Sequence, residues 1–260
     1  MAYIYETHLH TVEGSKCGRQ PARDYVRFMR DRGFQGFFVT DHFTGTQPCP
    51  DPALPWPKWV DAYCLGYEHA REEGAKVGVD VFFGWEQTMR SDEYLIYGLD
   101  REWLLQHPEC RRWTRQEMFQ AVDAAGALVV HAHPFRERGY IPYVQVHPYA
   151  CHAIEAANAG NEPYMDVMAT KYATALGKPM TAGSDIHWIS DATIFGVAFD
   201  TPLTSAMDYA QRIRNGIQPG LVVPQGRCVE PADAINTLQA VCYDNNGREM
   251  PMPIPVRKWE

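Results

Sequence analysis

The feature that most constrains the fold is an alternation of short apolar runs with longer amphipathic segments. Several of the short runs are continuous in apolar or aromatic residues, which is typical of strands covered on both faces of a sheet. We interpret eight of them as strands: Tyr3–His8, Gly36–Thr40, Val79–Glu86, Tyr94–Gly98, Ala127–His131, Ala153–Ala156, Met180–Ser184 and Phe195–Phe199.

Helices are predicted between these strands, because residues that start and stop helices fall there. Pro21 can open a helix that ends at Gly33, and a second helix is expected over Lys58–Glu73, before Gly74. The other start and stop signals are Thr114 with Glu117, Asn161, Gly177, Thr204 or Ser205, and Gly216.

This alternation predicts an α/β fold with mainly parallel strands. About seven repeats in one domain favour a closed or nearly closed (β/α)7 TIM-like barrel, with a doubly wound open sheet as the alternative. The chain has 260 residues, which suits one domain. We expect the barrel and its site within residues 1–225, and a C-terminal extension over 226–260 that packs on the barrel or trails from it.

Composition limits the partners of the chain. The formal net charge of −8 argues against a duplex nucleic-acid partner, because such binders carry a basic surface. The seven cysteines are scattered without a C-x-x-C pair, so we expect reduced thiols and a cytoplasmic location. No apolar stretch approaches ~20 residues, so no membrane association is expected.

Histidines and carboxylates stand at the ends of the predicted strands. His8 and His10 end the first strand as H-L-H, and residues two apart in a strand point to the same side. His131 and His133 repeat this spacing in H-A-H-P-F. The same spacing recurs, with a carboxylate in the first position, in G-S-D-I-H, which contains Asp185 and His187.

Two further predicted strands end in the same way. Asp41 and His42 follow Gly36–Thr40, and Glu86 closes Val79–Glu86. In a parallel barrel these strand ends open on one face, where the active sites of such barrels lie. Imidazole and carboxylate ligands suit Zn, Mn or Fe, so the pattern predicts a metal site without choosing the metal.

The motifs H-L-H, T-D-H, G-W-E, A-H-P and G-S-D-I-H, in this order, resemble the PHP (polymerase and histidinol phosphatase) superfamily. The resemblance spans residues 8 to 187. It implies a distorted seven-stranded barrel, two or three divalent metal ions and hydrolysis of phosphoesters by a metal-bound hydroxide.

Carried over position by position, the resemblance implies a ligand set and a catalytic core. It implies that His8, His10, Glu86 and Asp185 bind one ion, that Glu86 bridges to a second beside His133, and that His42 and His187 bind a third. Asp41 is expected to orient a ligand. The residues expected to be catalytic are Glu86, Asp185 and His187.

The chain departs from the family pattern at two positions. After H-L-H-T the family usually offers an Asp or His, and here Glu13 is the only strong oxygen ligand. The family often has a histidine in the strand after the glutamate, where this chain reads Glu93-Tyr94. Either Glu13 is a ligand of the third ion or that site is weak. His131, which is expected to face the same way as His133, is either a compensating ligand or a strand histidine bonded to a backbone group.

Substrate contacts are expected from basic residues near these strand ends. Arg136 and Arg138 follow the His133 strand and can clamp a phosphate through paired hydrogen bonds, and Lys16 lies on the first loop. Trp56 either lines a pocket or anchors its loop. Asn158 and Asn161 either bind a ligand or form a turn and a helix cap.

The expected function is metal-dependent hydrolysis of a small phosphorylated substrate, by a phosphatase or a phosphodiesterase. Alternatives within this chemistry are a protein phosphotyrosine phosphatase and a phosphoesterase for nucleotides or DNA 3′ ends. From a different class, the chain can be a non-catalytic metal-binding interaction module. The sequence does not determine the substrate, the metal or the oligomeric state.

Overall fold

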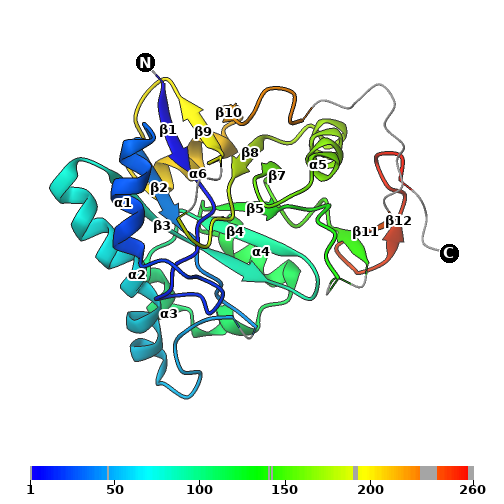
Figure 1. Ribbon diagram of the computed structural model, residues 1–260. Coiled ribbons are helices and arrows are strands. Elements are labelled where there is room, and N and C mark those ends of the chain that lie inside the picture. Colours follow the sequence, from blue (N-terminus) through cyan, green and yellow to red (C-terminus); the bar gives the residue numbers. More distant parts are fainter. Residues whose placement is uncertain are drawn as a thin grey trace.

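A computed structural model describes residues 2–45, 47–139, 141, 143–189, 193–228 and 239–256 (Figure 1). In chain order its elements are β1 (Tyr3–Glu6), α1 (Ala22–Asp31), β2 (Gly36–Val39), α2 (Trp56–Val77), β3 (Asp80–Thr88), β4 (Glu93–Tyr97), α3 (Arg101–Gln106), η1 (Pro108–Arg112), α4 (Arg115–Ala124), β5 (Leu128–Ala132), β6 (Val144–Val146), β7 (Ala153–Asn158), α5 (Pro163–Leu176), β8 (Met180–Gly183), β9 (Gly196–Phe199), α6 (Ala206–Arg214), β10 (Gly220–Val222), β11 (Ala240–Tyr243) and β12 (Glu249–Met250).

The larger sheet of the described chain follows the order β10-β9-β1-β2-β3-β4-β5-β7-β8 and curls into a nearly closed barrel. β8 lies beside β9 and β10, which brings the two ends of the sheet together. Just beyond β1 and β8, a parallel bridge between Leu9 and Ile186 links the two chain segments. The predicted α/β class and barrel architecture are therefore confirmed.

The direction of two strands differs from the expected parallel pattern. β4 runs antiparallel to both β3 and β5, because a short turn joins it to β3. β9 runs antiparallel to β1 and β10. The first residue of β4 therefore lies at the same end of the barrel as the last residues of its parallel neighbours.

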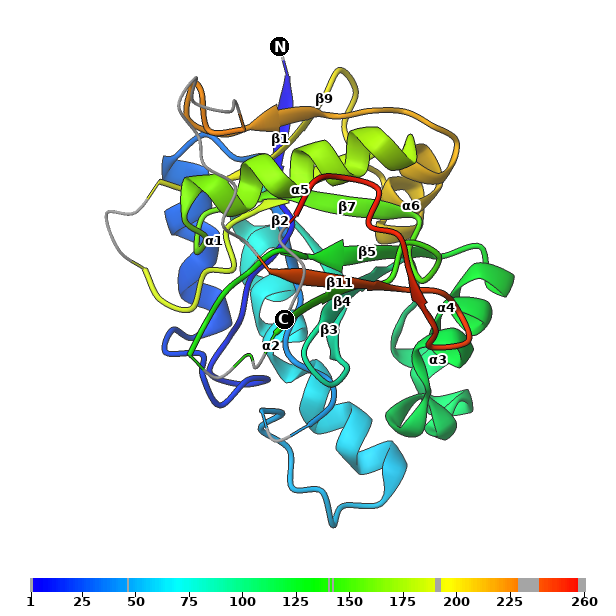
Figure 2. The same cartoon turned by 90° about the vertical axis from the view of Figure 1, so that its right-hand side faces the viewer.

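Two apolar layers hold the barrel together, and successive side chains of a strand alternate between them. Leu95 and Tyr97 of β4 face the barrel interior, where they pack with Tyr5, Phe38 and other buried residues. α6 contributes Tyr209 to the same interior cluster. The opposite face of the sheet packs against helices, and Figure 2 shows α5 lying over β7 on that outer side.

Two predicted helix boundaries are wrong. α2 continues through Gly74 and ends before Gly78, which has the left-handed φ of 74° that favours glycine. Gly74 is needed for packing instead, since a Cβ atom there would lie 2.5 Å from the carbonyl oxygen of Val79. The N-cap of α5 is Glu162 and not Asn161. The capping box of Thr114 and Glu117 is present as predicted.

The C-terminal part of the described chain forms a second, small sheet. β11 pairs in parallel with β6, and β12 pairs with β11. Figure 1 shows these strands at the side of the barrel remote from β1. Of the predicted C-terminal extension, residues 229–238 and 257–260 lie outside the described residues. Among the described helices, none combines the length and apolar character needed to cross a bilayer.

Candidate metal centre

Seven of the nine predicted metal ligands come together at one end of the barrel. They follow strands that are distant in the sequence, and the antiparallel β4 adds a carboxylate, Glu93, at the same end. The residues of this centre are His8, His10, His42, Glu86, Glu93, His133, Asp185 and His187.

The most compact part of the centre contains two imidazoles and two carboxylates. Nε2 of His8 lies 3.1 Å from Nε2 of His10, and each of these atoms lies 3.0–3.5 Å from an oxygen of Glu86 and from Oδ1 of Asp185. Four ligands placed about 2.1 Å from a tetrahedral ion are separated from one another by about 3.4 Å. The observed spacings therefore fit a divalent cation.

Glu86 occupies the middle of the centre. Its Oε1 atom lies 3.3 Å from Nε2 of His8 and 3.2 Å from Nε2 of His133. Its Oε2 atom lies 3.4 Å from Nε2 of His10 and 2.8 Å from Nδ1 of His42. Each carboxylate oxygen thus faces two imidazoles, an arrangement that suits a carboxylate bridging two ions.

The close pair of His42 Nδ1 and Glu86 Oε2 is not a hydrogen bond. Both atoms are buried, and neither has a hydrogen-bond partner among the described residues. Buried polar atoms are rarely left unpaired, so such a pair calls for another partner. The donor types and the spacing make a metal ion the natural one.

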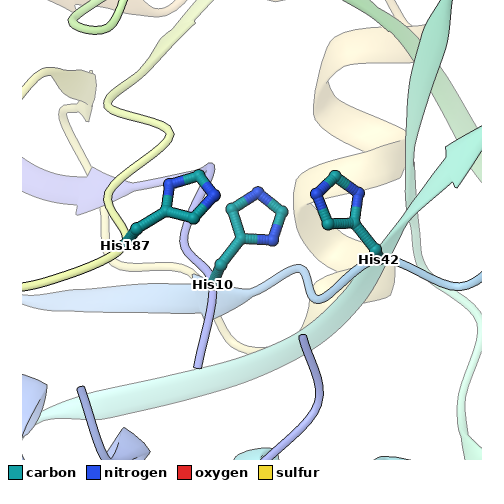
Figure 3. Close-up of side chains that lie close together, drawn as sticks. All are labelled: His10, His42 and His187. Atoms are coloured by element: carbon teal, nitrogen blue, oxygen red, sulfur yellow. The ribbon is translucent and has the colours of Figure 1, made fainter. Parts of the chain in front are cut away.

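A third group lies at the outer edge of the centre. The rings of His42 and His187 stack on opposite sides of the His10 ring, with centroid distances of 4.4 and 4.5 Å. Figure 3 shows the three rings side by side, carried by separate segments. Cys17 lines the same cavity as His42 and His187. Burial raises the pKa of the Cys17 thiol, but the imidazoles of His187 and His42 lower it by more, to about 7.

Glu155 in β7 holds two histidines of the centre in place, His8 through its ring and His133 through its backbone. Its Oε1 atom lies 3.0 Å from Nδ1 of His8, and its Oε2 atom accepts hydrogen bonds from the backbone N–H of His133 and from the amide of Asn158. A carboxylate behind a ligating histidine fixes the ring orientation and tautomer. Glu155 is fully buried, so this contact is shielded from water.

Asp41 holds the loop that follows His10. Its carboxylate accepts hydrogen bonds from the backbone N–H and hydroxyl of Thr11 and from the hydroxyl of Ser15, each at 2.7 Å. The Ser15 hydroxyl also accepts from the backbone N–H of His42 and lies 3.4 Å from Nδ1 of His10. Asp41 therefore acts on the histidines through Ser15, consistent with its expected orienting role.

Backbone strain is concentrated in the centre. His133 and Asp185 have φ values of 28° and 55°, and they are the non-glycine residues of the described chain with positive φ. Such conformations persist only where surrounding structure enforces them, and they cluster at functional sites. Here the left-handed backbone turns each side chain toward Glu86 and His10, respectively.

The electrostatics of the centre reflect its burial and its mixture of charges. Burial raises the pKa of Asp185, but the Arg136 guanidinium and His8 lower it by more. The net pKa therefore lies well below the usual range. Burial and the neighbouring imidazoles of His42 and His187 lower the pKa of His10 to about 3. Neutral imidazole and ionised carboxylate are the protonation states in which these groups bind metals.

His8 behaves differently from His10. Burial lowers its pKa, but the carboxylates of Glu155, Asp185 and Glu86 raise it more, so the net pKa lies well above the ordinary value. A proton on His8 thus neutralises part of the surrounding negative charge. A bound cation would compete with this proton.

Arg136 lines the centre but is committed to other residues. Its guanidinium donates from Nη1 to Asp185 at 2.5 Å, from Nη2 to Asn158 at 2.7 Å and from Nε to Asn161 at 2.8 Å. The side chain is 8% exposed. Of the two roles considered for Asn158 and Asn161, the structure thus favours a supporting one, because both hold Arg136.

The structure does not bring Glu13 to the centre. Its carboxylate accepts a hydrogen bond from the backbone N–H of Ala22 at the start of α1 and lies 3.3 Å from Nδ1 of His69. A carboxylate at a helix N-terminus is stabilised by the free backbone N–H groups there. Cys17, and not Glu13, lines the cavity beside His42 and His187.

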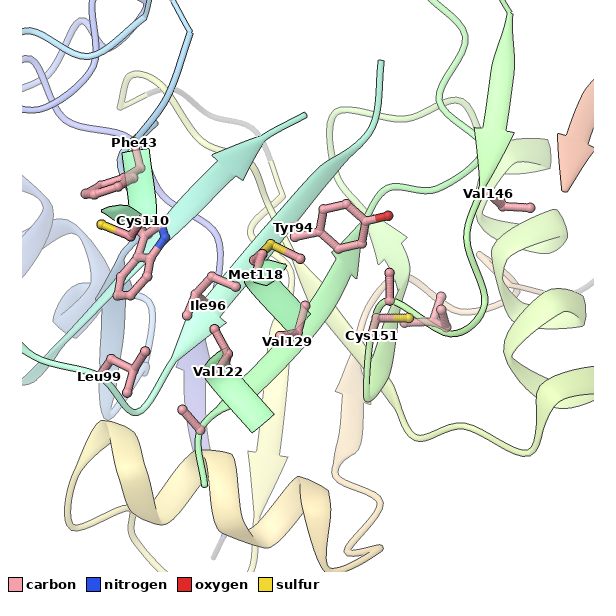
Figure 4. Close-up of a cluster of buried hydrophobic side chains, with 14 of the residues drawn as sticks. Phe43, Tyr94, Ile96, Leu99, Cys110, Met118, Val122, Val129, Val146 and Cys151 are labelled. Carbon is pink, nitrogen blue, oxygen red and sulfur yellow. The ribbon is translucent and has the colours of Figure 1, made fainter. Parts of the chain in front are cut away.

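The expectation that His131 faces the same way as His133 is wrong. His131 is opposite Tyr94 in the β4–β5 ladder, and its ring stacks on the Tyr94 ring at 4.8 Å. Figure 4 shows Tyr94 with Ile96 and Val129 in the apolar cluster on the outer face of the sheet. The strand alternation places His131 on this face, and only the left-handed backbone of His133 turns the second histidine inward.

A cavity of about 600 Å³ opens over the centre. This volume is typical of small-molecule sites. The residues lining it come from the metal centre, from loops beyond β1, β2, β5 and β8, and from the β3–β4 turn. They include Cys17, His42, Glu86, Arg90, Asp185 and His187.

Two residues expected to bind the substrate, Arg138 and Lys16, lie elsewhere. Arg138 donates to the carbonyl oxygens of Glu137 and Gly160, and neither it nor Lys16 lines this cavity. The indole N–H of Trp56 donates to the carbonyl oxygen of Leu104, so Trp56 anchors its segment and does not line the cavity.

Four residues of the site escaped the sequence reasoning: Cys17, Arg90, Glu93 and Glu155. Glu155 had a usable signal, since it is a lone carboxylate within an apolar strand. Glu93 required the direction of β4 to be known. Cys17 and Arg90 lie on turns, where the spacing of residues does not indicate which way a side chain points.

Comparison with family models gave no match, and comparison with curated proteins found no similar sequence. Among solved structures, the fold matches a two-domain protein from Bacteroides vulgatus that contains a predicted PHP-like metal-dependent phosphoesterase, with a TM-score of 0.57 and 15% identity over 82% of this chain. This chain spans 64% of the length of that protein.

Two other structures share the fold. PsfC from Pseudomonas syringae matches with a TM-score of 0.57 and 16% identity, over 87% of this chain and 93% of PsfC. A candidate metal-dependent phosphoesterase from Bifidobacterium adolescentis matches with a TM-score of 0.50 and 15% identity, over 73% and 90% of the two chains. At these identities the likeness establishes the fold, which is the one expected from the PHP-like motifs.

Proposed function

We propose that this chain is a metal-dependent hydrolase of the PHP type that cleaves phosphate esters of small molecules. The observation that carries the proposal is the convergence of His8, His10, Glu86 and Asp185 at spacings suited to one cation, beneath a cavity of about 600 Å³. The fold shared with the Bacteroides vulgatus protein supports it. The PHP-like motifs of the chain indicate the reaction class, which is phosphoester hydrolysis.

The residues divide naturally among two or three ions. We assign His8, His10, Glu86 and Asp185 to the first. Glu86 would bridge to a second, held also by His133 and Glu93, whose Oε2 atom lies 3.6 Å from Nε2 of His133. His42 and His187 would hold a third at the outer edge. The ligand types suit Zn, Mn or Fe.

The bound ions would supply a hydroxide nucleophile at neutral pH and charge neutralisation for the phosphoryl oxygens. The protein's own residues position these ions and set the protonation states of their ligands. Glu155 fixes the His8 ring, and Arg136 keeps Asp185 ionised. The left-handed backbones of His133 and Asp185 aim their side chains before substrate arrives, which reduces reorganisation during reaction.

Arg90 is the substrate-binding residue that the geometry favours. It lies in the β3–β4 turn, lines the cavity and is exposed, and no described residue makes an ion pair with it. Arginine binds phosphate through two parallel hydrogen bonds. We expect Arg90→Ala to raise KM while the metal content stays unchanged, with Arg138→Ala as the control. An unchanged KM for Arg90→Ala would rule out this role.

The proposed function is tested by stripping the protein of metal, reloading it with Zn, Mn or Fe, and screening hydrolysis. Suitable substrates are p-nitrophenyl phosphate, its bis ester, and sugar, nucleotide and amino-acid phosphates. We expect turnover that falls by at least about 100-fold in His8→Ala and Asp185→Asn, the scale of losing one key catalytic group. His107→Ala, on a histidine remote from the cavity, should be active.

The screen also separates the competing functions. Stoichiometric metal binding without turnover of any phosphoester would favour a non-catalytic metal-binding module. Turnover confined to phosphotyrosine peptides or to nucleic-acid 3′ ends would move the assignment to those alternatives.

A further inference from the structure

Cys17 lies where a third protein ligand for the outer ion would be needed. If His10 belongs to the first ion, the outer group retains only His42 and His187 as nitrogen ligands. Cys17 lines the same cavity as both of these histidines, and its loop is hydrogen-bonded to the segments that carry them. Three protein ligands with one open position is the usual arrangement at catalytic zinc.

The loop that carries Cys17 is fastened to the segments that carry both histidines. The backbone N–H of Lys16 donates to the carbonyl oxygen of Gln47, beyond His42, at 2.8 Å. The backbone N–H of Arg19 donates to the carbonyl oxygen of His187, also at 2.8 Å. The chain on either side of Cys17 is therefore bound to both histidine segments, which holds Cys17 between them.

Gly18 is part of this arrangement. A Cβ atom on Gly18 would lie 2.2 Å from the carbonyl oxygen of Thr11, closer than any real contact. The loop can therefore fold tightly back on the segment after His10 only with glycine at this position. This close approach brings Cys17 to the edge of the centre.

We propose that the sulfur of Cys17 completes the outer metal site with His42 and His187, and that it makes this site selective for zinc over manganese or magnesium. The inference deepens the proposed function and rests on its metal centre. Soft thiolate ligands favour zinc, whereas carboxylate and water suit manganese and magnesium. On binding, the S–H bond breaks, a sulfur–metal bond forms, and the proton passes to solvent.

The test uses cobalt(II) as a spectroscopic substitute for zinc in the full chain. Metal-free wild-type protein, Cys17→Ser and Cys49→Ser are loaded with cobalt, and the sulfur-to-cobalt charge-transfer band is recorded in the near ultraviolet. Cys49 is the matched control, because it lies on a neighbouring loop and its thiol donates to the carbonyl oxygen of Val12. We expect the band in wild type and Cys49→Ser, and its loss in Cys17→Ser.

Two further measurements keep the proposal testable if Cys17→Ser fails to fold. X-ray absorption of zinc-loaded wild-type protein should show one sulfur at about 2.3 Å from zinc. Saturating zinc should protect Cys17, but not Cys49, from alkylation. Where Cys17→Ser folds, its weakest zinc site should lose affinity by at least about 10–100-fold, the loss seen when supporting residues are removed, with manganese binding unchanged.

These outcomes are distinct from those that test the proposed function. A protein that hydrolyses phosphoesters without a sulfur–metal signature retains the proposed function and refutes the role of Cys17. The signature without turnover of any phosphoester supports Cys17 and refutes the hydrolase. Persistence of the band in Cys17→Ser would overturn the inference.

Discussion

The carboxylate of Glu155 lies 3.0 Å from Nδ1 of His8 and, through its other oxygen, 2.9 Å from the backbone N–H of His133. One buried side chain of β7 thus orients an imidazole after β1 and the strained turn after β5. The two histidines belong to different proposed ions. Glu155 is therefore the residue through which the barrel wall couples both parts of the centre.

Replacing Glu155 with glutamine should weaken metal binding without removing any ligand. Glutamine keeps the size of the side chain but cannot supply the negative charge behind His8. We expect a loss of about 10–100-fold in metal affinity, measured by competition with a chromophoric chelator. Glu162→Gln, on an exposed carboxylate, should bind metal as wild type does. Unchanged affinity in Glu155→Gln would show that this contact has no influence on the metal.

Glu93 should be replaceable by the histidine that the PHP-like motifs led us to expect nearby. Because imidazole suits the same metals, Glu93→His should retain the second ion, whereas Glu93→Ala should lose about one ion per chain. Elemental analysis after gel filtration measures this directly. Full metal content in Glu93→Ala would exclude Glu93 from the ligand set.

Removing Arg136 should have an effect that depends on metal loading. In the metal-free protein, Arg136→Ala leaves the buried carboxylate of Asp185 without its guanidinium partner. We therefore expect a loss of about 3–5 kcal/mol in the free energy of unfolding. Bound metal would neutralise Asp185, so the loss should be smaller in the loaded protein. Urea unfolding of both forms measures the difference.

The control for this experiment is Arg138→Ala, which removes a half-buried guanidinium from the same loop. We expect this change to shift the free energy of unfolding by no more than about 0.5 kcal/mol. An equal loss with and without metal in Arg136→Ala would mean that Arg136 acts only in packing and not on the charge of Asp185.

His147 should make the metal-free protein less stable in mild acid. Burial and the Arg115 guanidinium lower its pKa from 6.5 to about 4, despite the opposing charge of Asp92. As pH falls through this window, the unfolded chain binds a proton that the folded chain does not. The stability that the uncharged His147 gives the folded protein is therefore complete above pH 6.5 and is lost toward pH 4. The free energy of unfolding falls over this range with a slope of up to about 1.4 kcal/mol per pH unit.

Urea unfolding of wild type and His147→Asn across this range provides the measurement. Other groups titrate in both proteins, so the informative quantity is the difference between their slopes. We expect a shallower dependence on pH in the variant. Identical slopes would mean that His147 titrates in the folded protein as it does in the unfolded chain.

Much of the fold could be predicted from the sequence because its strands are apolar runs and its helices carry local capping signals. The capping box at Thr114 and the stop at Gly177 depend on neighbouring residues alone, and both are observed. The short strands β6, β10, β11 and β12 were missed. β6 and β11 are built by pairing between residues nearly a hundred positions apart, which no local pattern reveals.

The candidate site was predictable where ligands follow parallel strands, and not elsewhere. His8, His42 and Asp185 lie just beyond such strands, so their convergence could be predicted from the barrel alone. Glu93 begins an antiparallel strand, so the same rule overlooked it. His131 shows the converse error, because two-residue spacing indicates a common face only while the backbone remains extended, and His133 departs from that conformation.

The most direct test of the account is anomalous diffraction from crystals of the protein loaded with zinc and, separately, manganese. The account predicts a zinc peak within about 2.0–2.2 Å of ligand atoms from His8, His10, Glu86 and Asp185, with at least one further peak beside Glu86. Absence of ordered metal among these side chains in a loaded crystal would contradict the proposed centre and the hydrolytic function built on it.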